Sequence, residues 1–431
     1  MAKIGVLILH KKTDRGKSKT KSFDDLLYLG LKIILEDLKQ EYEYISFVNI
    51  KDYDFVLVSL TSVMDVENII CTLGKADKGK CKIIVGGSGC INIRSYIGYI
   101  DIAVFGRADN QINEIIDGAE FDNVWRKDKD PELKGSYIIR QVNKLNEKEN
   151  TIGCPRKCYF CQYTWTRKMI GERYHHGIDL KVDEDDFQKL EIKRSGRYTT
   201  AFDGLSASSR IAVNKTWCSV EEIKNKINGI YNNQKIIKPV NIKLFQIVGF
   251  PWESEQTFIT DLKENKSYWR RVDRKNKKKR IIFMYVFTPF SPEPLTPMQY
   301  SRANIIDNWR EYLGGAKCHN IYGDKTTDIE AFTLPQIPGG FTLAKRVLIN
   351  RCTKELKEKI VKILEYPKQK SVYVMVKNVI QYIGMDIFNK IDPQEAGFNY
   401  LKTYCNVNKL DGKAESKYKE LSSAKKPSIS S

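Results

Sequence analysis

Histidine is scarce in this chain of 431 residues, which contains four: His10, His175, His176 and His319. So few histidines leave little room for a His-rich zinc site or for a Ser-His-Asp triad. Long apolar runs are also missing. No segment approaches the roughly 18–20 consecutive apolar residues that a membrane span needs, so we expect no membrane partner. The composition, 42% hydrophobic and 11% aromatic, excludes wholesale disorder, and the length predicts two or three domains.

Signal-peptide architecture is absent as well. The first residues, Met1-Ala2-Lys3, lead directly into the strand-like segment Ile4–Leu9. We therefore expect the chain to be cytoplasmic, in a reducing compartment. Ten cysteines in such a compartment favour metal ligands over a disulfide framework.

The positive charge is concentrated in the second part of the chain. The net charge is +19, yet residues 1–150 contain 23 basic and 23 acidic side chains. The excess lies in 151–431, most densely in Lys266–Arg280 and again in Lys402–Lys426. Lys and Arg that neutralise phosphates release counterions, so this excess favours tRNA, DNA or another phosphate-bearing partner. The alternative is a lysine-rich composition whose charge runs are solvated helix ends.

Strand and helix patterns alternate through the first third of the chain. Strands are predicted at 3–9, 44–48, 55–60, 81–85 and 102–105, and helices at 23–39, 63–73 and 110–116. This alternation predicts an α/β fold, with a flavodoxin/Rossmann-like doubly wound domain over 1–118. Ligands of such sheets bind at the carboxyl ends of the strands. Residues 119–150 are predicted to be a linker that contains one strand, at 136–140.

A second parallel α/β unit is predicted over 151–315. Its strands are expected at 198–202, 242–248 and 281–287, and its helices at 219–231 and 254–269. We interpret it as a barrel or part of one. The remainder is predicted to be a mainly helical region over 316–408 and a disordered basic tail over 409–431.

Three cysteines form the sharpest motif: Cys154, Cys158 and Cys161 are spaced C-x3-C-x2-C in a segment that contains Gly and Pro. Three thiolates so close in sequence can surround one soft metal centre. The segment has no fourth cysteine or histidine to close a tetrahedral zinc site. A cubane iron–sulfur cluster held by three thiolates keeps one iron open for an external ligand. The alternatives are a zinc site completed by a distant residue such as Cys218, or buried thiols.

This spacing, with the aromatic Phe160 before the last cysteine, resembles the radical S-adenosylmethionine (SAM) superfamily. Two later stretches, Phe202–Arg210 and Ile247–Ser254, resemble the family's "GiEsgS-x-R" and "ivGlPgEt" segments in the same order. The resemblance implies a partial (β/α)6 barrel, in which the three cysteines bind a [4Fe-4S] cluster. It also implies that SAM chelates the unique iron and is cleaved to a 5′-deoxyadenosyl radical. An external one-electron reductant, of the flavodoxin or ferredoxin type, would supply the electron.

The same resemblance implies a set of cofactor-binding residues: Phe160, Asp203, Gly204, Ser206, Ser208, Arg210, Gln246 and Gly249. Small residues at a strand's carboxyl end let a cofactor approach the backbone, and hydroxyl or carboxylate groups there can hold a ribose or an ammonium group. The alternative for these stretches is a tight turn with a helix cap. The chain departs from the family at Asp203, where the pattern has Glu, and it lacks a Gly-Gly-Glu after the first barrel strand. No catalytic residue is assigned.

The front domain resembles the cobalamin-binding domain of the B12-dependent radical SAM class. Ser59 and Ser62, followed by Gly86 and Gly87, match that fold's Ser-x-Leu and Gly-Gly spacing, and Thr288–Tyr300 is similar to its "fxPkPhTPfQw" stretch. The glycines would open a slot for the nucleotide tail of cobalamin. The Asp-x-His-x-x-Gly element that supplies a cobalt ligand is missing, so the alternative is a relic domain that scaffolds the barrel.

The leading hypothesis is therefore a radical SAM enzyme, a cobalamin-dependent-type methyltransferase acting on an anionic substrate. Arg167 and Lys168, which follow the cysteines, are candidates to meet a substrate phosphate. The second hypothesis is a cobalamin-independent radical SAM enzyme that modifies or cleaves a nucleobase or a nucleic-acid-derived substrate. A third, of another class, is a non-catalytic Fe–S protein that binds nucleic acid.

Overall fold

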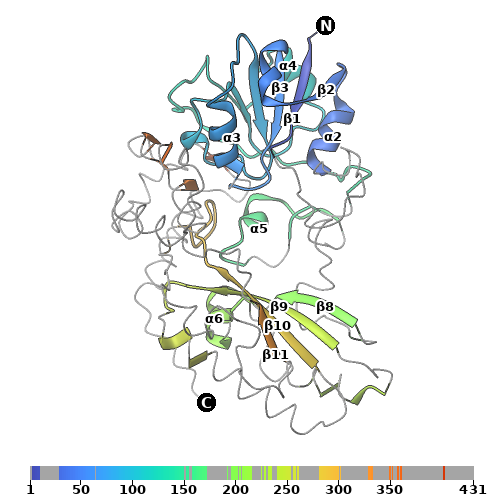
Figure 1. Cartoon of the computed structure of the whole chain (residues 1–431), viewed down its shortest axis with the longest axis vertical. Helices are drawn as coiled ribbons and strands as arrows, with labels where there is room; N and C mark the ends of the chain where they lie inside the picture. Colours follow the sequence, from blue (N-terminus) through green and yellow to red (C-terminus); the bar gives the residue numbers. More distant parts are fainter. Residues whose placement is uncertain are drawn as a thin grey trace.

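The computed structural model describes the front of the chain nearly completely and the rest in shorter stretches. The described residues are 2–9, 29–63, 65–149, 152–154, 158–171, 192, 196–201, 203–204, 206–215, 225, 228–229, 232–234, 240–253, 256–258, 260–261, 281–299, 301, 329–332, 349–350, 352, 357–358, 360–361 and 401–402. The protein is a mixed α/β structure with a mostly parallel six-stranded sheet (Figure 1). Among these residues no helix has both the length and the apolar character to cross a membrane.

The six-stranded sheet belongs to the front of the chain. Its strand order is β2-β1-β3-β4-β5-β6, and every neighbouring pair is parallel except β5 with β6. The strands are β1 (Ile4–Leu7), β2 (Tyr42–Ile45), β3 (Phe55–Ser59), β4 (Lys82–Gly86), β5 (Ile102–Val104) and β6 (Val124–Arg126). The helices are α2 (Leu29–Asp37), α3 (Asp65–Leu73) and α4 (Ile112–Ile116), with 3-10 turns η1 (Phe47–Asp52) and η2 (Ile93–Ser95).

Helices cover both faces of this sheet. Successive residues of a strand point to opposite sides, so one strand contributes apolar side chains to the core on each face. Val56 and Val58 of β3 pack with the α3 residues Ile69 and Ile70 in one core cluster. Leu57, between those valines, packs with residues of α2 and α4 in a second cluster. Near-continuous apolar strands are typical of parallel sheets buried on both faces. Each strand and helix predicted within residues 3–116 has a counterpart of the same kind, but the strand predicted at 44–48 ends at Ile45, and Phe47 and Val48 belong to η1.

The predicted linker over 119–150 is wrong in one respect. Its residues Val124–Arg126 form β6, which adds to the six-stranded sheet antiparallel to β5. Trp125 in this strand is fully buried. The strand predicted at 136–140 is the short β7 (Tyr137–Ile138), which pairs with β12 (Leu401–Lys402). A three-residue edge strand carries too short a pattern to be recognised from sequence.

A second sheet lies below the front sheet in Figure 1, with the order β11-β10-β9-β8 and all neighbours parallel. Its strands are β8 (Gly196–Ala201), β9 (Val240–Val248), β10 (Ile281–Pro289) and β11 (Ile329–Phe332). The first three were predicted. β11 was not, and it extends the sheet beyond residue 315, where the second unit was expected to end. Helices α5 (Gln162–Thr166) and α6 (Ala207–Ala212) accompany this part, and α5 lies between the two sheets.

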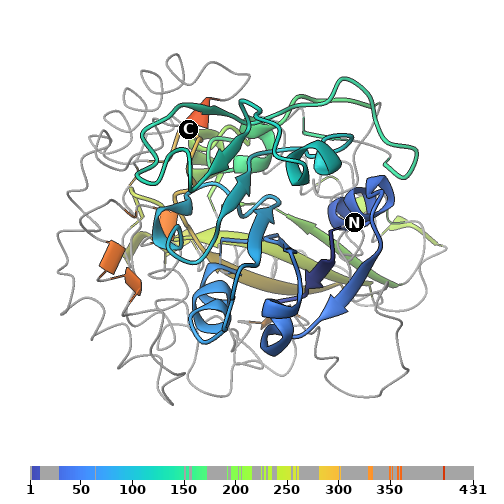
Figure 2. The ribbon, with the colours of Figure 1, turned by 90° about the horizontal axis from the view of Figure 1, so that it is seen from above.

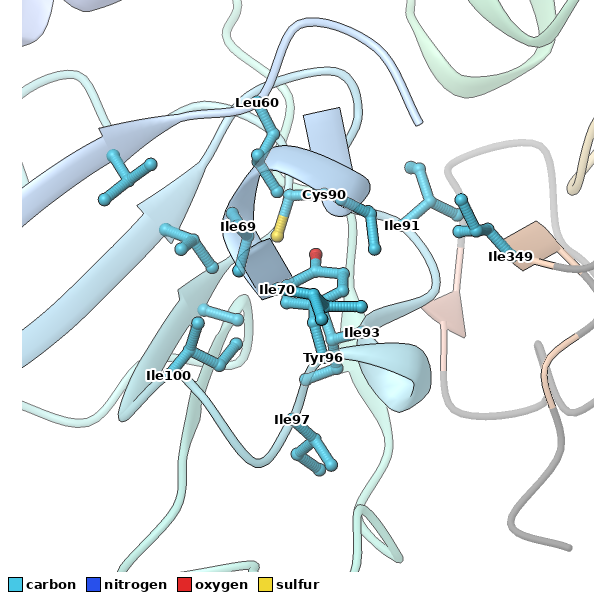
Figure 3. Close-up of a cluster of buried hydrophobic side chains, with 14 of the residues drawn as sticks. Leu60, Ile69, Ile70, Cys90, Ile91, Ile93, Tyr96, Ile97, Ile100 and Ile349 are labelled. Atoms are coloured by element: carbon cyan, nitrogen blue, oxygen red, sulfur yellow. The ribbon is translucent and has the colours of Figure 1, made fainter. Parts of the chain in front are cut away.

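One hydrophobic core runs from the front sheet to the second sheet. The cluster that contains α3 also contains Phe250, Phe290 and Met298, which follow β9 and β10. Ile349 and Cys352, from the C-terminal region, belong to it as well. Figure 3 shows Ile349 beside Ile91, with the side chains of Cys90 and Tyr96 pointing toward one another below them. Viewed from above, the front domain covers the second sheet (Figure 2).

Several predictions concern residues outside the described part of the chain. These are His10, most of the helices predicted at 219–231 and 254–269, the basic block Lys266–Arg280, most of the helical region 316–408 and the tail 409–431.

Candidate functional site

The three motif cysteines lie on one loop that enters helix α5. An antiparallel bridge between Ile152 and Ile170 closes the base of this loop. Cys154 and Cys158 are buried, whereas Cys161 is partly exposed and directly precedes α5. Three thiols are thus held within one short, closed segment.

Side chains of α5 reach back to hold the loop. The Thr164 hydroxyl donates a hydrogen bond to the Cys154 carbonyl at 2.8 Å, and the Trp165 indole N–H donates to the Cys158 carbonyl at 2.8 Å. The backbone at Tyr159 joins the loop to two distant segments: its N–H donates to the Val213 carbonyl, and its carbonyl accepts from the Met298 N–H. Hydrogen bonds from α5 and from the segments after α6 and β10 therefore hold the described backbone of the loop.

The three thiols share one electrostatic environment. Burial raises the pKa of Cys158 to about 12; the positive Lys215 lowers it, and Asp203, Cys161 and Cys154 each raise it further. Burial likewise raises the pKa of Cys161, opposed by the backbone N–H groups of Thr164 and Tyr163. Without a bound cation Cys158 and Cys161 are therefore protonated at neutral pH, and a metal centre would have to displace their protons.

Within the described residues, no three or more His, Cys, Asp or Glu side chains are arranged to hold a metal ion. A single zinc ion would need its thiolates about 2.3 Å from one common centre. A cubane of four irons separates its ligands more widely, because each thiolate binds a different iron.

A buried ion pair borders the cysteines. Asp203 and Lys215 form a salt bridge in which the Lys215 side chain is 6% exposed and the Asp203 side chain 15%. Both act on the pKa of Cys158. Lys215 was not predicted as a site residue. The short helix α6 lies between Asp203 and Lys215 in the sequence, and the chain on either side of it brings the two side chains together. The sequence signal available was the Asn214-Lys215 pair of the family pattern.

The serine-rich turn after β8 forms a helix cap. Ser206 accepts a hydrogen bond from the Ser209 N–H at 3.2 Å, so it is the N-cap of α6. Its hydroxyl also lies 3.0 Å from that of Ser208 and donates to that of Ser209 at 3.1 Å. The indole N–H of Trp252 donates to Ser209 as well. The described hydrogen bonds therefore match the helix-cap alternative for Ser206 and Ser208.

Gln246 and Arg210 hold the neighbouring glycine turn. The Gly204 N–H donates to the Gln246 side-chain oxygen at 3.2 Å, and Arg210 donates to the Gly204 carbonyl at 3.1 Å. Gln246 is fully buried, and its Nε2 has no hydrogen-bond partner among the described residues. A buried amide that lacks an acceptor costs free energy, so this donor is suited to a bound polar group.

The turn after β9 is held by a carboxylate that sequence reasoning missed. Glu253 accepts hydrogen bonds from the N–H groups of Gly249 at 2.6 Å and Phe250 at 3.1 Å. Burial raises the pKa of Glu253 to about 7, and Asp261 adds to the rise, while the two backbone donors lower it. The available signal was the four-residue spacing of Gly249 and Glu253, which is typical of a local side-chain cap.

Backbone atoms occupy the space beside two glycines of the front domain. A Cβ at Gly87 would lie 2.3 Å from the Leu60 carbonyl oxygen, and one at Gly89 would lie 2.5 Å from that of Ser62. Hydrogen bonds join Leu60 N–H to the Gly86 carbonyl and Gly89 N–H to the Leu60 carbonyl. The turn after β3 therefore lies against Gly87 and Gly89, whereas a Cβ at Gly86 would make only ordinary contacts with Val104, at 3.8 Å. The slot that these glycines would open for a nucleotide tail stays a prediction.

The same turn is capped internally. The buried carboxylate of Asp65 accepts from the backbone N–H groups of Thr61 and Ser62 and from the Thr61 hydroxyl, at 2.7–3.0 Å. Ser59, the last residue of β3, pairs in register with Gly86. The two serines thus lie at the carboxyl edge of the front sheet, as predicted.

A cavity of about 360 Å³ opens between the two sheets. It is bounded by turns of the front sheet, by the cysteine loop with α5, and by residues that end or follow β9 and β10. Its lining residues are Thr61, Ser62, Val63, Ser88, Gly89, Ile91, Asn92, Phe160, Cys161, Gln162, Tyr163, Arg167, Ile247, Phe290, Ser291, Glu293 and Asn350. Of the residues predicted for the site, the cavity thus brings together Ser62, Phe160 and Cys161, together with Arg167, a predicted contact for a substrate phosphate.

The other predicted residues do not line the cavity. Asp203 lies in the electrostatic environment of Cys158, whereas Gly204, Ser206, Ser208, Arg210, Gln246 and Gly249 form the turns described above and Ser59, Gly86 and Gly87 belong to the front sheet. Comparison of the chain with models of known protein families gave no match, and comparison with curated proteins gave none either.

Proposed function

We propose that the protein is a radical SAM enzyme whose cysteine loop holds a [4Fe-4S] cluster beside the cavity. One observation carries the proposal: Cys161 lines the cavity, while the buried Cys154 and Cys158 share its electrostatic environment. Three soft thiol donors without a fourth described ligand suit a cluster with one open iron. Bound there, the cluster would pass one electron to SAM and release a 5′-deoxyadenosyl radical.

The chain's own residues prepare this position. Thr164 and Trp165 hold the carbonyls of Cys154 and Cys158, so the backbone of the loop is fixed before any cluster is loaded. The charge of Lys215 favours the thiolate form of Cys158, and the Asp203 carboxylate balances that charge inside the protein.

The fold supports the same proposal. The strand order of β1–β5 in the front sheet, 2-1-3-4-5, is that of flavodoxin-like domains, and β8–β11 form a parallel array of the kind expected for a partial barrel. The cysteine loop and the turns after β9 and β10 meet at the carboxyl ends of these strands, where ligands of parallel sheets bind.

The backbone of Leu60 and Ser62 lies against Gly87 and Gly89, so these two glycines leave little room for a cobalamin tail at their own positions. We derive no step through cobalamin. The front domain then acts as the wall that closes the cavity over the cysteine loop. Methyl transfer from cobalamin remains a hypothesis, tested by adding hydroxocobalamin and recording the visible spectrum of the repurified protein.

Anaerobic reconstitution tests the enzyme. We expect a brown protein with about four irons per chain that forms 5′-deoxyadenosine from SAM under reductant. The variants Cys154→Ala, Cys158→Ala and Cys161→Ala should each lose both properties. Cys71→Ala, a cysteine of α3 away from the loop, is the matched control and should keep them. Deoxyadenosine formation by the triple variant would refute the proposal. A cluster that never cleaves SAM would favour the non-catalytic Fe–S protein instead.

A further inference from the structure

The cavity contains one strongly basic side chain, Arg167. This residue caps the C-terminal end of α5 and lines the cavity with Tyr163. Its guanidinium carbon lies 4.4 Å from the centroid of the Tyr163 ring, which holds the group by a cation–π contact. Cys161 and Arg167 also interact electrostatically, so the guanidinium lies near the cysteine loop.

Arg167 differs from its neighbour Arg107 in its partners. Arg107 is paired with Asp109 and, at 2.6 Å, with Glu149. Among the described residues no carboxylate forms an ion pair with Arg167. Burial lowers the pKa of Arg167, and the charge of Arg107 lowers it further. A guanidinium withdrawn from water with its five donors unused by a carboxylate favours an external anion.

A second donor belongs to a residue of the same cavity lining. Ser291, just after β10, has a buried hydroxyl oxygen with no hydrogen-bond partner among the described residues. Other polar groups of the lining are engaged: the Thr61 hydroxyl donates to Asp65, and the Ser88 hydroxyl donates to the Thr61 carbonyl at 2.7 Å. Arg167 and Ser291 come from segments 124 positions apart, so only the fold brings these donors to one space.

The remaining lining limits what else can bind. Phe160, Ile247 and Phe290 give the cavity an apolar side. Glu293 is the one acid among the described lining residues, and its Oε2 lies 3.4 Å from the Asn350 amide nitrogen. A volume of about 360 Å³ is near the lower end for small-molecule sites, which run from roughly 300 to 1,000 Å³. The space suits one small molecule.

We propose that this cavity is the substrate site and that it takes a small molecule with a carboxylate or phosphate group, held by Arg167 and Ser291. The apolar side then carries the rest of the molecule beside Cys161. The reaction at this site rests on the proposed function, whereas the binding of an anion does not. Since the family resemblance assigns the carboxylate of SAM to the cluster iron, the anion at Arg167 belongs to a second molecule.

The test is anion binding by the reconstituted full-length protein, measured by isothermal titration calorimetry. The probes are ribose 5-phosphate, inorganic phosphate, benzoate and acetate, which separate a phosphate from a carboxylate preference. We expect saturable binding of one probe class and about a tenfold or greater rise in Kd in Arg167→Gln, since a charge-assisted hydrogen bond is lost. Ser291→Ala should raise Kd severalfold.

The matched control is Lys134→Gln, which removes the same charge from an exposed residue outside the cavity lining. It should leave Kd unchanged. An equal loss in Lys134→Gln would show general surface attraction and overturn the proposal, as would no binding of any probe, or tRNA binding indifferent to Arg167→Gln. Because binding requires no SAM cleavage, loss of anion binding and loss of deoxyadenosine formation can be told apart.

Discussion

Gly87 offers the sharpest test of why the front domain has its glycines. The residue has φ +103°, and a Cβ there would lie 2.3 Å from the Leu60 carbonyl oxygen. Gly118 is a matched control, because it has φ +98° but no atom within 4 Å of the added Cβ. Both alanine variants carry the same backbone strain, and only Gly87→Ala adds a backbone overlap.

The magnitudes follow from these two contributions. An alanine in the left-handed region costs about 1 kcal/mol, so Gly118→Ala should lose about that much. Overpacking adds about 1–3 kcal/mol, so Gly87→Ala should lose about 2–4 kcal/mol. With a urea dependence of about 2 kcal/mol per M, the two unfolding midpoints should differ by about 1 M.

The assay is urea unfolding of the full chain followed by circular dichroism, with hydrogen exchange at β3 and β4 to locate the loss. If Gly87→Ala proved as stable as Gly118→Ala, the turn after β3 would not fill this space. If the wild-type protein took up hydroxocobalamin and Gly87→Ala did not, the result would support the slot hypothesis.

Three further changes test the site's supports. Glu253→Gln keeps an oxygen that accepts from Gly249 and Phe250, but its side chain cannot ionise. The pKa of Glu253 is about 7 in the folded protein against an ordinary 4.5, so the stability of the wild-type protein falls as the pH rises through this window. The variant should therefore gain on the wild type by roughly 3 kcal/mol between pH 4.5 and 8 in thermal unfolding, and a constant difference would contradict this. Thr164→Val leaves the Cys154 carbonyl without its donor and should speed iron loss to a chelator, whereas Thr166→Val, which removes a bond inside α5, should not. Asn92→Ala removes the amide within 3.1–3.2 Å of three carbonyls of 349–352, so hydrogen exchange there should rise, and unchanged exchange would rule out this anchor.

The elements of the front sheet were predictable because their signals are local. The apolar runs of β1, β3, β4 and β5 and the periodic spacing of α3 follow from the two side-chain repeats of strands and helices. The strands that were not predicted, β6, β11 and β12, have three, four and two residues, so their patterns are too short to stand out. Their places are decided by pairing with β5, β10 and β7.

The candidate site divides in the same way. The spacing of Cys154, Cys158 and Cys161 is a local property, and the sequence alone predicts that one loop carries all three thiols. The close approach of Leu60 to Gly87 was not predictable, because a glycine that admits a ligand and one that admits a neighbouring turn look identical in sequence. Helix caps and cofactor turns use the same serines and glycines for the same reason.

What the sequence by itself determined is therefore the alternation of strands and helices, the soft thiol motif and the segregation of positive charge. Tertiary structure alone decided that Arg167 and Ser291 share one cavity and that Lys215 lies beside Cys158. It also decided that Asn92 binds a segment more than 250 residues away. Local patterns follow from backbone geometry, whereas these contacts depend on how buried surfaces from distant segments pack together.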